Sequence, residues 1–235
     1  RVSATISRNG DLVSKMYVEL DCTCTTNDPI AAHGADRGIN LGHGGLKEIE
    51  LEIGGQRIDK HYSQWLQAWD ELSNSRYQDT ITVNNSPATP ANHTEANLRY
   101  APNSYQVMVG GSSYTTADGK TFHVPLQFWF CRNPGLALPL IALQYHEVKV
   151  AIDFEESANI GNGTVTSIDA AKLWVDYIYL DTDERRRFAQ LSHEYLIEQL
   201  QFTGSEQITG TSTKGVRMNF NHPCKELIWT VKIAD

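Results

Sequence analysis

The residues of this sequence that could do chemistry are scattered, and none falls into a spacing that defines a catalytic site. His33 and His43 lie in a Gly-rich stretch near Asp36, and Cys22 and Cys24 stand upstream as a C-x-C pair. Together they could bind a metal ion, but the short fixed spacings of known zinc sites are missing. Solvated loop histidines are the simpler interpretation, so we expect no metal and no other cofactor.

A serine–histidine pair and clustered carboxylates offer the remaining routes to catalysis. The run Ser192–Glu194 reads Ser-His-Glu, but a catalytic triad is assembled from side chains that converge in space. The acids of Asp181–Glu184 are better explained by a helix N-terminus than by a glycosidase pair. Glu147 follows His146 directly, and neighbours on a strand face opposite sides. With no G-x-S-x-G elbow and no phosphate-binding loop, we predict that the protein is not an enzyme.

Composition describes an ordinary globular chain of 235 residues, with 40% hydrophobic and 20% charged residues. Its formal charge of −8 argues against a general nucleic-acid binder, which needs a cationic surface. Four cysteines are too few for a disulfide scaffold. The most apolar stretch, 125–150, is interrupted by Arg132, Pro134 and Pro139, so we expect no transmembrane helix. Both ends look like cuts through a longer protein.

Alternation of apolar and polar residues dominates the sequence and predicts strands. In 46–53, LKEIELEI, aliphatic residues alternate with Glu, which indicates one buried and one wet face. In 173–180 both alternating sets are largely apolar, so we expect that strand to be covered on both faces. The segments with this pattern are 46–53, 122–130, 146–154, 173–180, 196–202 and 227–233. Strands of this length between turn-rich segments predict a β-sandwich or barrel.

Helical periodicity is clear once and suggested a second time. In IDKHYSQWLQAWDEL, Asp59 is a candidate N-cap, and an apolar stripe runs through Tyr62, Trp65, Leu66, Trp69 and Leu72. A short helix is predicted from Asp181 to Leu191, with acids at its start and Arg185, Arg186 and Arg187 after them.

Polar loops separate these elements. The long ones are 27–45 and 84–97, and 203–215 has the Gly/Ser/Thr composition of a linker, after which strand patterning restarts at Val216. Asn-x-Ser/Thr sequons occur at Asn84, Asn92 and Asn162, which are possible glycan acceptors if the protein enters a glycosylating compartment.

Several long blocks together resemble the major capsid proteins of nucleocytoplasmic large DNA viruses, most closely the phycodnavirus and mimivirus-like branch that infects algae. The blocks are LEIGGQRIDKHYSQW, FWFCRNPGLALPLIALQYHEV, LWVDYIYLDTDERRRFAQLSHEYLIEQLQF and FNHPCKELIW. The resemblance implies an all-β chain with two consecutive jelly rolls, one amphipathic helix and one short helix. Placed against that pattern, residues 1–203 look like the first roll without its N-terminal arm and opening strand. Residues 204–215 look like the linker, and 216–235 like the start of the second roll.

The resemblance also implies a function and its partners. Three chains would form a capsomer of pseudo-hexagonal outline, and the capsomers, with minor capsid proteins, would tile an icosahedral shell over an internal membrane. Such a protein would be located in the virion, after assembly in the host cytoplasm, with no direct contact to nucleic acid expected.

Buried aromatic and Arg anchors are typical of subunit interfaces. Our interface candidates are therefore Tyr62, Trp65, Trp69, Arg185, Arg186 and Arg187. Two alternatives stay open: a jelly-roll carbohydrate- or receptor-binding module and a cupin-type enzyme. The first would use loop aromatics such as Tyr77, Tyr100, Tyr105 and Tyr114.

Overall fold

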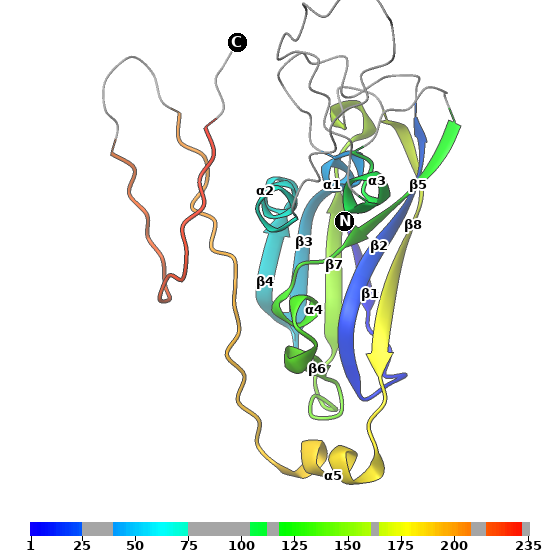
Figure 1. The fold of residues 1–235 in the computed structure, drawn as a ribbon, viewed down its shortest axis with the longest axis vertical. Coiled ribbons are helices and arrows are strands. Elements are labelled where there is room, and N and C mark those ends of the chain that lie inside the picture. Colours follow the sequence, from blue (N-terminus) through cyan, green and yellow to red (C-terminus); the bar gives the residue numbers. More distant parts are fainter. Residues whose placement is uncertain (25–39, 75–103, 112–117, 161–164, 208–214, 232–235) are drawn as a thin grey trace, which may run out of the picture. The chain divides into compact units, whose positions relative to one another are not determined.

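The computed structural model describes residues 1–24, 40–74, 104–111, 118–160, 165–207 and 215–231. The chain divides into two compact units, which we call unit 1 (Arg1–Gln199) and unit 2 (Leu200–Asp235). Unit 1 contains every helix and strand of the described residues (Figure 1).

One sheet of unit 1, sheet A, has four antiparallel strands in the order β1-β7-β3-β4. Its strands are β1 (Val2–Thr5), β7 (Val148–Phe154), β3 (Leu46–Ile53) and β4 (Gln56–Tyr62). A two-residue turn, Gly54-Gly55, joins β3 to β4, and both glycines have positive φ (59° and 80°). Side chains avoid this conformation, which explains the glycine pair. The strand predicted at 46–53 is confirmed with its bounds.

The second sheet, sheet B, is centred on β2 (Leu12–Cys24). One edge of β2 pairs with β5 (Asp118–Pro125) and, beyond it, with the short β6 (Leu138–Pro139). The opposite edge pairs along its whole length with β8 (Val165–Ile178). Because β5 and β8 both pair with residues 17–24 of β2, they lie on its two sides, and in the described part of the chain each of them pairs with β2 alone.

The two sheets enclose a single hydrophobic core (Figure 1). On β2 the inward residues Val13, Met16, Val18 and Leu20 are at most 1% exposed. The all-β jelly-roll class predicted from the sequence is confirmed. The outward face of β3 is less wet than its Glu residues suggest, because Glu50 is only 7% exposed.

Glu50 is buried among cations rather than in water. Arg1 forms an ion pair with Glu50. Lys60 Nζ lies 3.3 Å from Glu50 Oε1, and Arg57 Nη1 lies 3.6 Å from the same oxygen. Burial opposes its ionisation, but hydrogen bonds from Lys60 and the charge of Arg1 prevail, so the pKa of Glu50 is lowered.

Within the described ranges five helices accompany the sheets, more than the two predicted. They are α1 (Leu41–Gly45), α2 (Ser63–Ser73), α3 (Ser104–Met108), α4 (Trp129–Arg132) and α5 (Thr182–Gln190). There are also 3₁₀ turns at Pro134–Leu136 and Ser157–Asn159. The extra helices are single turns, too short for periodicity to reveal.

Two predicted boundaries are wrong. Asp59 does not cap α2, because residues 56–62 pair with β3 as β4 and the N-cap position falls on Tyr62. The strand expected over 122–130 ends at Pro125, which pairs with Tyr17. Phe128 and Phe130 are nevertheless buried, since α4 folds back onto the core. After α4 the chain turns, and Asn133 Oδ1 accepts from Gly135 N at 2.9 Å.

The remaining strand predictions separate into confirmed and unconfirmed. Strands β7 and β8 occupy the segments expected near 146–154 and 173–180, but β8 is not covered on both faces, as Trp174 is 47% exposed. The structure assigns no strand within 191–207 or 215–231, so the described parts of the strands predicted at 196–202 and 227–233 are not formed. A strand requires a hydrogen-bonded neighbour, which the sequence pattern alone does not supply. No helix of the described ranges has the length and apolarity to cross a bilayer.

Candidate subunit interface

The aromatic residues of α2 lie at the flank of the helix rather than on its buried face. Leu66 and Asp70, one turn apart, are buried. Trp65 and Trp69 are half-buried, and their rings lie 5.5 Å apart between centroids with a tilt of 34°. Leu72, at the end of the predicted stripe, is 64% exposed. The inward face of α2 is therefore narrower than the apolar stripe, and it includes an acid.

Trp69 is covered by its own chain. The guanidinium of Arg132, from α4, lies 4.9 Å from the ring centroid of Trp69 in cation–π geometry. Arg132 Nη2 also donates to Glu198 Oε2 at 2.8 Å. Gln199, the next residue, donates from Nε2 to the carbonyl of Ile58 on β4. The aromatic flank of α2 thus anchors the segment by which the chain leaves unit 1.

The start of α2 is built on a buried imidazole–carboxylate pair. His61 Nε2 lies 3.0 Å from Asp59 Oδ2, and both residues are 4% exposed. The ring of His61 stacks on Phe128 at 4.7 Å, and Lys60 Nζ lies 5.2 Å from the ring centroid of Tyr62. Tyr62 is half-buried as a result. The predicted N-cap, Asp59, serves as the partner of a core histidine.

A buried polar cluster ties α2 to α1 and α3; it consists of Asn40, His43, Gln67, Asp70 and Tyr105. His43 is fully buried, so the expectation of a solvated loop histidine is wrong for this residue. Its Nδ1 lies 3.1 Å from Gln67 Oε1 and its Nε2 3.1 Å from the Tyr105 hydroxyl. Gln67 Oε1 also accepts from Asn40 N at 3.0 Å, and Asn40 Nδ2 donates to Asp70 Oδ2 at 3.0 Å.

These contacts assign the state of His43. Since Gln67 Oε1 is an acceptor, Nδ1 carries the hydrogen, and Nε2 accepts from the Tyr105 hydroxyl. Burial lowers the pKa of His43, which favours this neutral form, against smaller opposing effects of the Gln67 hydrogen bond and the Asp70 charge. The neutral imidazole of His43 therefore has a structural role: it links α1 to α2 and α3 by hydrogen bonds.

Two features of the sequence, an acid on the apolar side of α2 and the Gly-rich run before β3, could have indicated the buried polar cluster. Asp70 stands one turn after Leu66 on the inward face, where an acid requires buried donors. Gly42 lies against the core, and a Cβ there would be 2.8 Å from Val124 Cγ2 and 2.9 Å from the Val109 carbonyl oxygen. The Gly-rich run is therefore a close-packed helix.

The other groups considered for metal binding or catalysis have structural roles or lie outside the described residues. His33 and Asp36 are outside, and Cys22 and Cys24 point into the core from β2. In the described ranges no three His, Cys, Asp or Glu side chains converge on a possible metal position. His193 stacks on Phe188 at 4.8 Å, and its Nε2 lies 3.0 Å from the Phe188 carbonyl oxygen.

The arginines of α5 divide into one that is paired within unit 1 and two that project outward. Arg185 Nη2 donates to Asp11 Oδ2 at 2.9 Å, and Leu180 N donates to the same oxygen at 2.8 Å. The Arg185 hydrogen bond, followed by that of Leu180, lowers the pKa of Asp11. Arg186 Nη1 lies 3.9 Å from Oδ1 of the exposed Asp183, a long contact.

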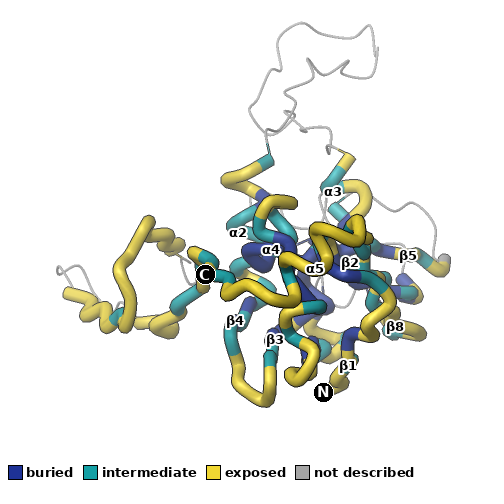
Figure 2. Tube along the Cα trace, turned by 90° about the horizontal axis from the view of Figure 1, so that it is seen from below, coloured by how far each residue is buried: buried dark blue, intermediate teal, exposed yellow. Residues whose placement is uncertain are grey.

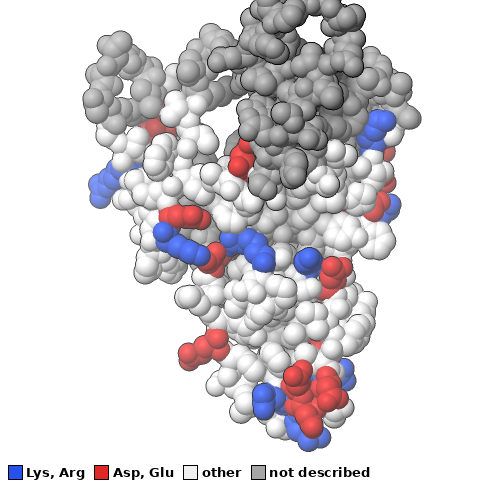
Figure 3. Space-filling model, in the orientation of Figure 1, with Lys and Arg blue, Asp and Glu red and all other residues white. Residues whose placement is uncertain are grey.

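Helix α5 itself forms as the sequence predicts. Asp181 Oδ1 accepts from Thr182 N at 2.7 Å, so Asp181 is the N-cap of the helix. None of the residues of α5 is buried, and Figure 2 shows the helix as an exposed segment. In Figure 3 acidic and basic side chains lie next to each other at the end of unit 1 where Figure 1 places α5. Arg186 and Arg187 are therefore accessible to another molecule, whereas Arg185 holds the helix to the sandwich.

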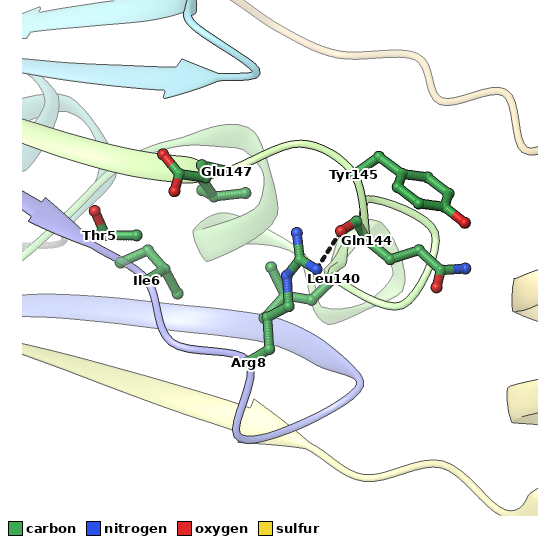
Figure 4. Close-up of a pocket in the computed structure, with 8 residues that line it drawn as sticks. Thr5, Ile6, Arg8, Leu140, Gln144, Tyr145 and Glu147 are labelled. Carbon is green, nitrogen blue, oxygen red and sulfur yellow. Dashed lines mark hydrogen bonds between the residues drawn. The ribbon is translucent and has the colours of Figure 1, made fainter.

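A small pocket of about 340 Å³ lies beside the turn before β7 (Figure 4). Arg8 reaches across it, and its Nη2 donates to the carbonyls of Leu143 (2.9 Å) and His146 (3.1 Å). Glu147 on the rim forms an ion pair with Lys149 at 2.7 Å. Arg8 thus holds the turn, and Glu147 is paired with Lys149 of β7 rather than free in the pocket.

The glycan acceptors proposed from sequence, Asn84, Asn92 and Asn162, lie outside the described residues. So do Tyr77, Tyr100 and Tyr114 of the carbohydrate-binding alternative. Its fourth aromatic, Tyr105, belongs to the buried polar cluster and is not a free surface ring.

Comparison with known proteins gives a consistent result. Residues 1–181 match the family model described as the major capsid protein N-terminus, and 184–235 match that of the large eukaryotic DNA virus major capsid protein. The major capsid protein of Pyramimonas orientalis virus is 50% identical over 241 residues, covering 100% of this chain and 52% of that protein. The major capsid protein of Paramecium bursaria Chlorella virus 1 is 44% identical, covering 97% of this chain and 48% of that protein.

A solved structure agrees. A quasi-atomic model of the PBCV-1 virus capsid superposes with a TM-score of 0.72 at 39% identity, covering 94% of this chain and 49% of that one. The chain spans about half the length of the curated relatives it matches. The resemblance seen in the sequence is confirmed: the chain belongs to the family of major capsid proteins of large eukaryotic DNA viruses.

Proposed function

We propose that the protein to which these residues belong builds a viral shell from many copies of itself. Three chains form a capsomer of pseudo-hexagonal outline, and capsomers tile an icosahedral shell together with minor capsid proteins. Family membership over the whole chain carries this proposal. The sandwich supports it, because a rigid β scaffold can present fixed surfaces to neighbouring copies.

The role is structural and not enzymatic. The titratable side chains that could have been catalytic, such as His43, His61 and Asp11, are engaged in contacts that join helices to the sandwich. The protein acts in the virion shell after assembly in the host cytoplasm, near an internal membrane and without direct contact to nucleic acid.

The domain arrangement that we propose assigns 1–203 to a first jelly roll, 204–215 to a linker and 216–235 to the start of a second roll. The two family models meet near residues 181–184, and compact unit 1 ends at Gln199. These boundaries fall between the start of α5 and Gln199, which is before the proposed end of the first roll at residue 203.

Contacts between copies use the outward side chains of the candidate interface. Arg186 and Arg187 are exposed on a helix that Arg185 fixes in place, so pairing with acids of a neighbour would order their side chains but not the helix. Tyr62, Trp65 and Trp69 contribute the parts of their rings that unit 1 leaves uncovered.

The test is the oligomeric state of the full-length gene product, measured by light scattering after size-exclusion chromatography and by electron microscopy. We expect trimers and hexagonal particles. The double variant R186A/R187A should lower the trimer fraction, whereas K47A/R57A, which also removes two exposed cations of unit 1, should not.

A strict monomer at high concentration would contradict the capsomer proposal. Trimers that resist R186A/R187A would contradict only the assignment of the interface. Binding of the protein on a glycan array, without self-assembly, would favour the carbohydrate- or receptor-binding alternative.

A further inference from the structure

The turn between β1 and β2 has an Asn-Gly pair, Asn9-Gly10, at its tip. Asn9 is exposed and Gly10 is half-buried. The start of the turn is held to the sandwich, because the Tyr177 hydroxyl donates to the Ser7 carbonyl at 2.6 Å. Within the described part of the chain, neither Asn9 nor Gly10 takes part in a hydrogen bond. Nothing in that part of the chain thus engages the two amides that an Asn-Gly pair brings together.

An Asn-Gly pair can react with itself. Asparagine is thermolabile, and a glycine that follows it has no Cβ to obstruct attack by its backbone nitrogen. The Gly10 nitrogen attacks the side-chain carbonyl carbon of Asn9, and its proton leaves with the side-chain nitrogen as ammonia. A cyclic imide remains, which water opens at either of its carbonyl carbons. The product is aspartate, or isoaspartate, in which the main chain runs through the side-chain carbons and is longer by an atom.

Asp11, the residue after the pair, is only 8% exposed and joins several segments of unit 1. Its Oδ2 atom accepts hydrogen bonds from Leu180 N and Arg185 Nη2. Its backbone N donates to the Ile178 carbonyl at 3.1 Å, and its carbonyl accepts from Ile141 N at 3.2 Å. The position of Asp11 thus fixes both the start of α5 and the segment that follows β6.

We propose that Asn9 is a site of spontaneous deamidation, and that isoaspartate formed there loosens α5 from the sandwich. Gly10 is packed against Tyr177, since a Cβ on Gly10 would lie only 2.6 Å from Tyr177 Cβ. The extra main-chain atom therefore cannot be accommodated by a shift of Gly10 toward β8, and it displaces Asp11 instead. Aspartate, the other product, adds the same charge without lengthening the main chain and leaves α5 attached. The proposal goes beyond the proposed function, because it assigns a chemical modification to a turn outside the candidate interface.

The first experiment follows the reaction in the full-length gene product, stored in mildly alkaline buffer, where the attacking nitrogen loses its proton more readily. Peptide mapping by mass spectrometry detects replacement of the amide by a carboxylate, and isoaspartyl methyltransferase labels isoaspartate. Conversion at Asn9 should be at least about tenfold faster than at Asn159, which is also exposed but precedes the β-branched, buried Ile160. N9Q should abolish conversion at this position. The second Asn-Gly pair, Asn162-Gly163, lies outside the described residues and is measured on a separate peptide.

The second experiment measures hydrogen exchange in the peptides that contain Leu180 and Ile141, whose amides donate to Asp11. Both peptides should exchange faster in the isoaspartate form than in fresh protein, whereas N9D and stored N9Q should exchange like fresh protein. Exchange in β3 is the internal reference and should be the same in every sample. Conversion at Asn9 no faster than at Asn159, isoaspartate without faster exchange, or an equal effect of N9D would each overturn the proposal.

Discussion

Strands β2 and β8 lie side by side in sheet B and have nearly the same length, yet their side chains are buried to different degrees. Val18 of β2 pairs directly with Leu173 of β8. Val18 is 1% exposed, whereas Leu173 is only partly buried. Both side chains point into the core, so direction does not distinguish them. What differs is the surroundings: β2 pairs with β5, β6 and β8, whereas β8 pairs, in the described part of the chain, with β2 alone, and its inner side chains keep part of their surface uncovered.

The largest effect expected from this contrast is on stability. Leu20 of β2 is fully buried, so Leu20→Ala should remove about 2–5 kcal/mol from the free energy of unfolding through lost transfer energy and a cavity. Leu173→Ala removes the same atoms at a half-covered position and should cost less than half as much. Urea denaturation of the two variants measures both values. Equal losses would show that the edge of β8 is covered in solution.

The same contrast shows what the sequence could predict. Alternation located β3, β7 and β8, since it depends on the chain's own side chains. The cap at Asp181 was also predictable, because its hydrogen bond is local. Alternation failed for 227–231, because a strand also needs a partner. The resemblance identified the family and the jelly roll independently of these local signals.

The candidate site was less predictable than the fold. The burial of His43 depends on Gln67 and Tyr105, which are 24 and 62 residues away in sequence. Likewise, the pairing of Arg185 with Asp11 joins residues 174 positions apart. Sequence alone identified residue types that suit an interface, but which of them already contact their own chain is a property of the tertiary structure.

The second prediction concerns the cysteine thiols, which, like Leu20 and Leu173, differ in how far they are buried. Cys22 and Cys24 are buried on β2, whereas Cys224 in unit 2 is exposed. Burial raises the pKa of Cys22 to about 12, so almost none of it is thiolate at pH 8. A thiol reagent at pH 8 should modify Cys224 at least about a hundredfold faster than Cys22 or Cys24. Labelled peptides identified by mass spectrometry give the rates, and in urea all sites should react.

The raised pKa of the Cys22 thiol also makes the stability of the fold depend on pH in alkaline solution. Because the pKa of Cys22 is higher in the folded than in the unfolded chain, its contribution to stability is complete below about pH 9 and decreases as pH rises toward 12. Rapid modification of Cys22 in the native chain at pH 8 would contradict the burial of the inner face of β2.

The third prediction uses the buried histidine. Burial lowers the pKa of His43 below its unfolded value of about 6.5. The unfolded chain therefore binds the proton first, so the stability that neutral His43 contributes is complete above pH 6.5 and is lost as pH falls toward the folded pKa. The urea midpoint should fall from pH 7.5 to 5.5, and His43→Gln should reduce this difference. Leu66→Ala, which destabilises the same helix without a titrating change, should keep it.

The groups that face His43 decide how this result is interpreted. Gln67 and Asp70 face it from α2, Tyr105 from α3 and Asn40 from the residue before α1. Asp70 is the one carboxylate among them, and its charge opposes the effect of burial. A midpoint difference that His43→Gln leaves unchanged would assign the acid sensitivity to paired carboxylates such as Asp11 and Glu50 instead.

The smallest effect is expected on the outer face of β8. Trp174 stacks with Tyr17 of β2 at 6.2 Å, and its Nε1 donates to Glu19 at 2.7 Å, but the ring is half exposed. Glu19 keeps a second partner, Lys172, at 2.6 Å. Trp174→Phe retains most of the stacking and should change Tm by less than about 2 °C, as surface substitutions usually do. A larger loss, measured by calorimetry at several protein concentrations, would mean that another copy covers this face. If the loss grew with concentration, the outer face of β8 would belong to a contact between copies, and the contrast with β2 would hold only for the isolated chain.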